Sequence, residues 1–285
     1  MNTKWSPGSP STPTSVSTLR RIQVGDVELA LEDHGRGEPL VLVHGFPFDR
    51  RMWRGQIGAF DGFRLILPDV RGHGESEPAP PPYSMTTLAE DLRQLLDHLG
   101  LDRVVIGGLS MGGYIALAFA ARYPERLSAL LLIDTQAAAD SPEAREKRAE
   151  LSARARRDGV EAVAGEMLER LVGGRNVTPE VADLVRQMIL GTSVEGMVGA
   201  LAGMAARPDS TPLLPKIACP TLVVVGQDDA VTPPETARSM AAAIPRAELV
   251  EIPSAGHLAP LEQPPAVNAA IRSFLSRALA RPAAR

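Results

Sequence analysis

Apolar and polar residues alternate in two short segments near the start of the chain, 20–24 and 27–32. The dipeptide Gly25-Asp26 joins them, which is typical of a β-hairpin turn. Later segments are mostly apolar and no longer than a strand, which indicates strands buried on both faces. These later strands are predicted at 39–45, 63–69, 102–107, 127–134, 220–226 and 247–252.

Apolar residues between the strands recur at helical spacing. In segment 86–99 the leucines fall on one helix face, and Gly100 follows as a stop. Thr86 or Thr87 is the expected N-cap of this helix. Further helices are predicted at 114–122 and 265–279. The alternation of strand and helix favours an α/β fold with a doubly wound, mostly parallel sheet and helices on both faces.

The alternation breaks once, between Asp134 and Cys219, where no strand is evident. Four helices are predicted there, at 142–157, 159–171, 179–190 and 194–206. We therefore expect an all-helical cap inserted between two strands of the core, with a surface bundle that only adds bulk as the alternative. The predicted boundaries are 1–18 for a disordered tail, 19–136 and 216–285 for the core, and 137–215 for the cap.

Composition narrows the classes of function. The chain has 285 residues, of which 44% are apolar and 22% charged, as in an ordinary globular protein. The net charge of -4 leaves no basic stripe, so we expect no nucleic-acid partner. No apolar run approaches a membrane span, and the tail lacks the apolar core of a signal peptide. The single cysteine, Cys219, cannot form an intrachain disulfide, so a cytoplasmic location is expected. The sequence says nothing about oligomeric state.

Ser110 lies at the most informative point of the chain, between the strand at 102–107 and the helix at 114–122. The pattern Gly108-x-Ser110-x-Gly112 is typical of a nucleophile elbow, a tight strand-to-helix turn that holds a serine in an exposed, strained position. A plain Gly/Ser-rich turn is the alternative interpretation, and the remaining candidate residues decide between them.

A serine nucleophile needs a base, and His257 is the best placed of the five histidines. It follows the last strand, at the edge of the sheet where open α/β folds place functional groups. His44 and His73 also follow strands, but they precede the serine, whereas the base comes last in the expected order.

The acid that orients the base should lie on another loop that follows a strand. Asp228 and Asp229 are adjacent in such a loop, and Asp134 ends an earlier strand. Only one of the two adjacent carboxylates can point at the imidazole. Spacing alone leaves all three open.

These residues belong to five motifs that occur in the order seen in the α/β-hydrolase family, which the chain resembles from Arg20 to its last helix. The motifs are His44-Gly45-Phe46-Pro47, Asp69-Val70-Arg71-Gly72-His73-Gly74-Glu75-Ser76, Gly108-Leu109-Ser110-Met111-Gly112, Gly226-Gln227-Asp228-Asp229, and Gly256-His257 with Glu262 and Pro264. The Gly-x-x-Asp form of the fourth motif gives the acid role to Asp229 rather than to Asp228.

The resemblance implies roles for five residues. Ser110 attacks an acyl carbonyl, His257 transfers the proton, and Asp229 orients the imidazole. The backbone N–H groups of Phe46 and Met111 form the oxyanion hole. Water completes the reaction, so neither a metal nor an organic cofactor is expected, and no Cys/His cluster has the spacing of zinc ligands.

Members of the family that resemble this chain include esterases, lactonases, carbon–carbon bond hydrolases, cofactor-free perhydrolases, haloalkane dehalogenases and epoxide hydrolases. The last two use an aspartate where this chain has Ser110, which excludes them. We expect a carboxylesterase for small to medium uncharged esters, with a lactonase for enol-lactones or acyl-homoserine lactones as the alternative. A perhydrolase, a carbon–carbon bond hydrolase and a non-catalytic ligand receptor are less favoured.

Methionines and leucines of the predicted cap are candidates for an adaptable apolar pocket, with an ordinary cap core as the alternative. The charged faces of the cap helices are expected in solvent. The candidates are Met167, Met188, Met197, Met204, Leu168, Leu171, Leu190 and Leu201.

Overall fold

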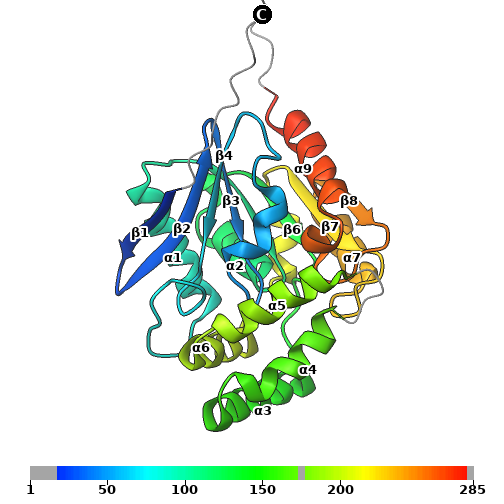
Figure 1. Cartoon of the computed structure of the whole chain (residues 1–285). Coiled ribbons are helices and arrows are strands. Elements are labelled where there is room, and N and C mark those ends of the chain that lie inside the picture. Colours follow the sequence, from blue (N-terminus) through cyan, green and yellow to red (C-terminus); the bar gives the residue numbers. More distant parts are fainter. Residues whose placement is uncertain (1–17, 173–176, 281–285) are drawn as a thin grey trace, which may run out of the picture.

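The computed structural model describes residues 18–172 and 177–280. Its centre is an eight-stranded sheet with the order β1-β2-β4-β3-β5-β6-β7-β8 (Figure 1). The strands are β1 Thr18–Val24, β2 Val27–Gly35, β3 Glu38–Val43, β4 Phe63–Pro68, β5 Val104–Leu109, β6 Leu127–Ile133, β7 Thr221–Gly226 and β8 Ala247–Ile252. The pairs β1/β2 and β2/β4 are antiparallel, and every other pair is parallel. The mostly parallel α/β sheet predicted from the sequence is confirmed.

Helices pack on both faces of this sheet. In Figure 1, α1 and α2 lie behind the sheet, and α9 lies in front of it with a short 3₁₀ helix, Arg50–Gln56. The α-helices are α1 Met85–His98, α2 Met111–Arg122, α3 Pro142–Asp158, α4 Glu161–Val172, α5 Pro179–Gly191, α6 Val194–Ala205, α7 Pro234–Ala243, α8 Ala259–Glu262 and α9 Pro264–Ala278. Two further 3₁₀ helices are Pro124–Arg126 and Thr211–Lys216.

Local sequence explains most of these elements. Every residue of β5 and of β7 is buried, as expected for central strands covered on both faces. The predicted N-cap of α1 is wrong, because Ser84 rather than Thr86 or Thr87 caps the helix and accepts a hydrogen bond from the Thr87 N–H at 3.0 Å. Helices α7 and α8 were not predicted from the sequence.

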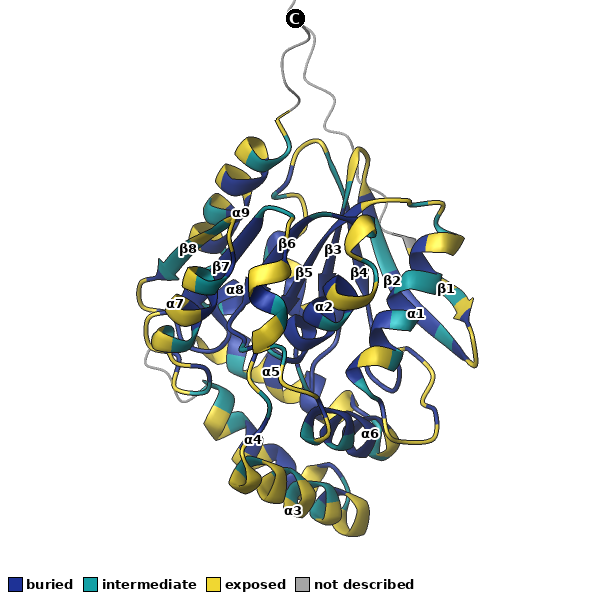
Figure 2. Ribbon diagram, turned by 180° about the vertical axis from the view of Figure 1, so that it is seen from behind, coloured by how far each residue is buried: buried dark blue, intermediate teal, exposed yellow. Residues whose placement is uncertain are grey.

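Helices α3 to α6 occupy the chain between β6 and β7 and gather at one end of the sheet (Figure 1). Within this group α3 contacts α6, and α4 contacts α5. Figure 2 shows α3 largely exposed, and Ala155 is its one buried residue, whereas most of α6 is buried. The four helices match the predicted insertion, and the domain boundaries at 137 and 215 stay a prediction. Residues 1–17, where most of the predicted tail falls, lie outside the described residues.

Within the described ranges, no single helix is both long and apolar enough to cross a membrane. Helices α5 and α6 taken together are long and apolar enough to cross a membrane, but the chain bends by 95° between them.

Candidate active site

Ser110 joins the end of β5 to the start of α2 in a conformation that few non-glycine residues adopt, with φ 52° and ψ -112°. The chain can make this turn because its flanking residues are glycines. A Cβ on Gly108 would lie 2.1 Å from the carbonyl of Gly112, and a Cβ on Gly112 would lie 2.2 Å from the Val43 oxygen. The Ser110 carbonyl accepts a hydrogen bond from Thr135 Oγ1 at 2.7 Å, which fixes the turn from the next strand end.

His257 and Asp229 form a buried pair on neighbouring loops. The imidazole Nδ1 lies 2.9 Å from Asp229 Oδ2, and the side chains are 3% and 0% exposed. The backbone N–H groups of Val231 and Thr232 donate to Asp229 Oδ1 at 2.7 and 2.9 Å, and Thr232 Oγ1 donates to Oδ2 at 2.6 Å. Burial raises the pKa of Asp229, but the hydrogen bond and charge of His257 and the hydrogen bonds of Thr232 outweigh burial and hold this pKa below its usual value. The lowered pKa favours the ionised form of Asp229, which is hydrogen-bonded to the imidazole of His257.

The other two carboxylates that the sequence left open lie elsewhere. Asp228 is exposed, and its backbone N–H donates to the Ala255 carbonyl at 2.8 Å. Asp134 is fully buried and accepts hydrogen bonds from the N–H groups of Gly226 and Ala259 at 2.8 and 3.2 Å. Burial first, and then the nearby charge of Asp229, raise the pKa of Asp134 well above its usual value. Asp134 thus links the end of β6 to the end of β7 and to the start of α8 by hydrogen bonds.

His44 and His73 are buried beside the loop that contains Phe46. His44 Nε2 accepts a hydrogen bond from the Val70 N–H at 3.0 Å, and its Nδ1 lies 2.8 Å from the Gly45 carbonyl. Burial lowers the pKa of His44. Burial, and repulsion between the two rings when both are protonated, lower the pKa of His73 to about 3. Both rings are neutral supports of the loop.

Two backbone N–H groups beside Ser110 are available as donors. Within the described part of the chain, neither the Phe46 N–H nor the Met111 N–H donates a hydrogen bond to a protein acceptor. Phe46 lines the same cavity as Ser110, and Met111 is the first residue of α2, whose N-terminus favours negative charge.

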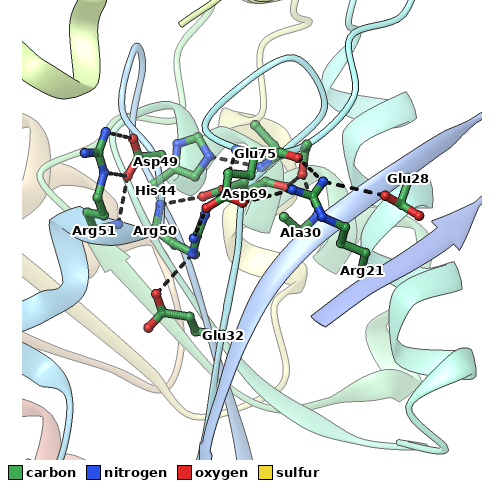
Figure 3. Close-up of polar contacts among 12 residues, drawn as sticks. Arg21, Glu28, Ala30, Glu32, His44, Asp49, Arg50, Arg51, Asp69 and Glu75 are labelled. Atoms are coloured by element: carbon green, nitrogen blue, oxygen red, sulfur yellow. Dashed lines mark hydrogen bonds and ion pairs between the residues drawn. The ribbon is translucent and has the colours of Figure 1, made fainter. Parts of the chain in front are cut away.

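An ion-pair network that sequence reasoning missed fixes the loop between β3 and its following 3₁₀ helix (Figure 3). The buried Arg50 guanidinium contacts Asp69, Glu75 at 2.6 Å and Glu32 at 3.1 Å, and the Arg50 N–H donates to Asp69 at 2.7 Å. Burial lowers the pKa of Arg50, but the charges and hydrogen bonds of Asp69 and Glu75 outweigh burial and raise it. Asp69 stood in a recognised motif, but nothing near Arg50 in the sequence identified it as the partner.

Ser110, His257 and Phe46 line one cavity of about 690 Å³. The core contributes Phe46, Ser110, Tyr114, Val231 and His257 to its wall. Ser110 and His257 face this space without a hydrogen bond between them among the described contacts, as is common before substrate binds.

The inserted helices form the rest of the wall. Four of the eight apolar candidates line the cavity, namely Met167, Met204, Leu171 and Leu201. Of the other four, Met188 and Met197 are fully buried in the core, Leu168 packs half-buried against it, and Leu190 is 37% exposed. Charged side chains of α3 and α4 also line the cavity, although the sequence reading placed such faces in solvent.

Among residues 18–172 and 177–280, no group of three or more His, Cys, Asp or Glu side chains could hold a metal ion.

Comparison with known proteins places this geometry in context. The sequence profile of the alpha/beta hydrolase fold matches residues 38–264. An enol-lactonase of Acinetobacter baylyi, 3-oxoadipate enol-lactonase 2, is 30% identical over 257 residues, which cover 88% of this chain and 94% of that protein.

Solved structures show the same likeness. A thermophilic esterase from Thermogutta terrifontis, solved with malate bound, is 49% identical, covers 91% of this chain and 99% of its own, and superposes with a TM-score of 0.87. An enol-lactonase from Burkholderia xenovorans LB400 is 32% identical with a TM-score of 0.84, and the match covers 90% of this chain and 100% of that one.

Proposed function

The chain belongs to the α/β-hydrolase fold family, and on this premise we propose that it hydrolyses carboxylic esters through an acyl-enzyme formed on Ser110. The observation that carries the proposal is the buried His257–Asp229 pair, 2.9 Å apart, whose imidazole lines the same cavity as Ser110. The proposal is also supported by the names of similar proteins, an esterase and two enol-lactonases, because both names denote cleavage of an ester bond.

In the proposed first step, Ser110 Oγ attacks the acyl carbon, and its proton passes to His257 Nε2. The pairing of Nδ1 with Asp229 favours the tautomer in which Nδ1 carries a proton and Nε2 is free to accept one. The carboxylate then stabilises the imidazolium, which returns the proton to the leaving oxygen. The nearby Thr232 hydroxyl keeps Asp229 oriented.

The oxyanion of the tetrahedral intermediate would accept hydrogen bonds from the N–H groups of Phe46 and Met111. Both donors are backbone groups on rigid supports, so little reorganisation accompanies the reaction. Water then attacks the acyl-enzyme with His257 as the base, and the proposed cycle uses only substrate and water.

A lactonase is the second candidate, because two of the similar proteins are named enol-lactonases. The same residues would open a cyclic ester and release a single hydroxy or keto acid. Hydrolysis of p-nitrophenyl esters of increasing acyl length beside simple lactones and acyl-homoserine lactones separates the two candidates.

We propose α3 to α6 as the cap that selects the substrate, since residues of α3, α4 and α6 line the cavity. We also propose a cytoplasmic location, since Cys219 is the only cysteine. The proposed partner is the small-molecule substrate.

A serine-reactive fluorophosphonate tests the proposed function. The protein should lose p-nitrophenyl butyrate hydrolysis as it gains one adduct on Ser110. Ser110→Ala should lose the adduct and about 10⁴-fold or more of kcat. Ser239→Ala, which changes a surface serine of α7, is the control and should retain both. Normal labelling or turnover by Ser110→Ala would refute the assignment.

A further inference from the structure

The part of the cavity wall that α3 and α4 contribute is charged. Its cations are Lys147, Arg148, Arg154 and Arg170. Its carboxylates are Glu143, Glu150 and Glu166. The numbers of the two signs are nearly equal, so burial and pairing decide which charge a substrate would meet.

The carboxylates lie on the outer part of this wall. Glu143 and Glu150 are exposed, so water screens their charges. Glu166 is 64% exposed and pairs with Arg154 at 2.6 Å. Arg148 differs from the other charged lining residues, because only 22% of its side chain is exposed.

Arg148 shares its carboxylate partner with a second arginine. Asp140 accepts from Arg148 Nε at 2.5 Å and from Arg207 Nη1 at 2.6 Å, and the Asp140 and Arg207 side chains are 2% and 3% exposed. Burial raises the pKa of Asp140, but the two arginines outweigh burial and lower it. Within the described chain, Arg148 and Arg207 form no ion pair with any other carboxylate. Two guanidinium groups therefore share one carboxylate, and one positive charge is left over.

This cluster of three side chains sits next to the nucleophile. Arg207 stacks over the ring of Tyr114 at 4.0 Å, and the Tyr114 N–H donates to the Ser110 carbonyl at 3.2 Å. Arg207 does not line the main cavity, whereas Arg148 does, together with Tyr114 and Ser110. Arg148 is thus the member of the cluster that can meet a ligand.

We propose that the cavity selects esters whose acyl part carries a second, free carboxylate, and that Arg148 binds this carboxylate and determines the preference. Such a substrate supplies the missing negative charge and pairs with Nη1 of Arg148, which contacts Met204 Sδ at 3.5 Å, whereas Nε and Nη2 contact Asp140. The inference rests on the proposed ester hydrolysis. It replaces the expectation of uncharged substrates, which assumed that the charged faces of the cap helices lie only in solvent.

Two esters of equal acyl length test the proposal, mono-p-nitrophenyl glutarate and p-nitrophenyl pentanoate. Arg148→Gln should lower kcat/KM for the glutarate ester about tenfold, mainly through KM, and change the pentanoate ester by less than about twofold. Arg148→Lys should retain part of the preference. Arg145→Gln changes an exposed arginine of the same helix that does not line the cavity, and should leave both values unchanged.

Equal losses for the two esters, or no loss for either, would overturn the proposal. If Arg148→Gln does not fold, inhibition of the wild-type protein still tests the proposal. Glutarate should inhibit pentanoate ester hydrolysis about tenfold more strongly than glutaramide, and added NaCl should weaken this difference. Equal inhibition by both refutes the role of Arg148. Absence of any ester hydrolysis, with no fluorophosphonate adduct, would instead refute the proposed function.

Discussion

Asp228 and Asp229 are neighbours with the same chemistry, but their surroundings differ. Asp228 is exposed, whereas the side chain of Asp229 is buried and has hydrogen bonds to His257, Val231 and Thr232. The turn after β7 points only the second carboxylate at the imidazole. Only Asp229 is therefore placed to act as the proposed acid.

We therefore predict that Asp229→Asn lowers kcat for p-nitrophenyl butyrate by about 10⁴-fold, because the amide favours the wrong imidazole tautomer. Asp228→Asn is the matched control and should stay within about twofold of wild type. Steady-state kinetics of the two variants measure the difference. A larger loss for Asp228→Asn would move the acid role to that residue.

The elbow shows how an element depends on its smallest residues. Ser110 can take its unusual backbone angles because Gly108 lets α2 approach the end of β5 and Gly112 lets α2 approach the end of β3. We predict that Gly108→Ala lowers the free energy of unfolding by more than about 2 kcal/mol. Gly165→Ala in α4, where an added Cβ meets nothing within 4 Å, should raise it by up to about 1 kcal/mol. Urea unfolding compares the two; equal effects would contradict the crowding argument.

The antiparallel edge of the sheet depends on one carboxylate. Asp33 on β2 accepts from Arg64 on β4 at 2.7 and 2.9 Å and from Arg20 on β1 at 2.8 Å. The hydrogen bond from Arg64 is the largest influence and, with the other contacts of both arginines, lowers the pKa of Asp33 below its usual value of 3.8, although burial opposes it. Since the folded pKa is the lower one, the stabilisation is complete above the unfolded pKa and is lost as the pH falls through the folded pKa.

Asp33→Asn should therefore lower the free energy of unfolding by about 1 kcal/mol at pH 7. The difference from wild type should shrink as the pH falls below about 4. Urea unfolding at a series of pH values tests this, and a difference independent of pH would show that the charge of Asp33 does not stabilise the edge.

At the scale of the whole molecule, the chain between α5 and α6 contacts the loop that holds Phe46, one of the two proposed oxyanion donors. Thr192, after α5, is buried, and its Oγ1 lies 3.0 Å from the Pro47 carbonyl, next to Phe46. The Tyr83 N–H donates to the Gly199 carbonyl of α6 at 3.0 Å. Hydrogen bonds thus join the inserted segment to the core at two places, one of them next to Phe46.

Thr192→Val keeps the shape of the side chain but leaves the Pro47 carbonyl without this donor. We expect a loss of about 1 kcal/mol in the free energy of unfolding and a several-fold lower kcat for p-nitrophenyl butyrate. Thr192→Ser should restore both, because it returns the hydroxyl. Unchanged kcat in a destabilised Thr192→Val variant would show that this contact supports the fold alone.

The sequence by itself predicted the order of the strands and of most helices, and the position of the sharp turn at Ser110. These features depend on neighbouring residues: short apolar runs become buried strands, and glycines at Gly108 and Gly112 permit the sharp turn at Ser110. It also brought the candidates for base and acid down to a few residues, because functional side chains gather where parallel strands end.

Only the tertiary structure decided which side chains meet. It paired His257 with Asp229, made Asp134 a fastener between loops, and joined Arg50 to Asp69. It also directed part of the charged surface of α3 and α4 toward the cavity. Behind Arg148, Asp140 accepts hydrogen bonds from both Arg148 and Arg207. These contacts join residues from separate elements. The charge and role of each side chain depend on where it points and how deeply it is buried, and no local sequence pattern encodes either property.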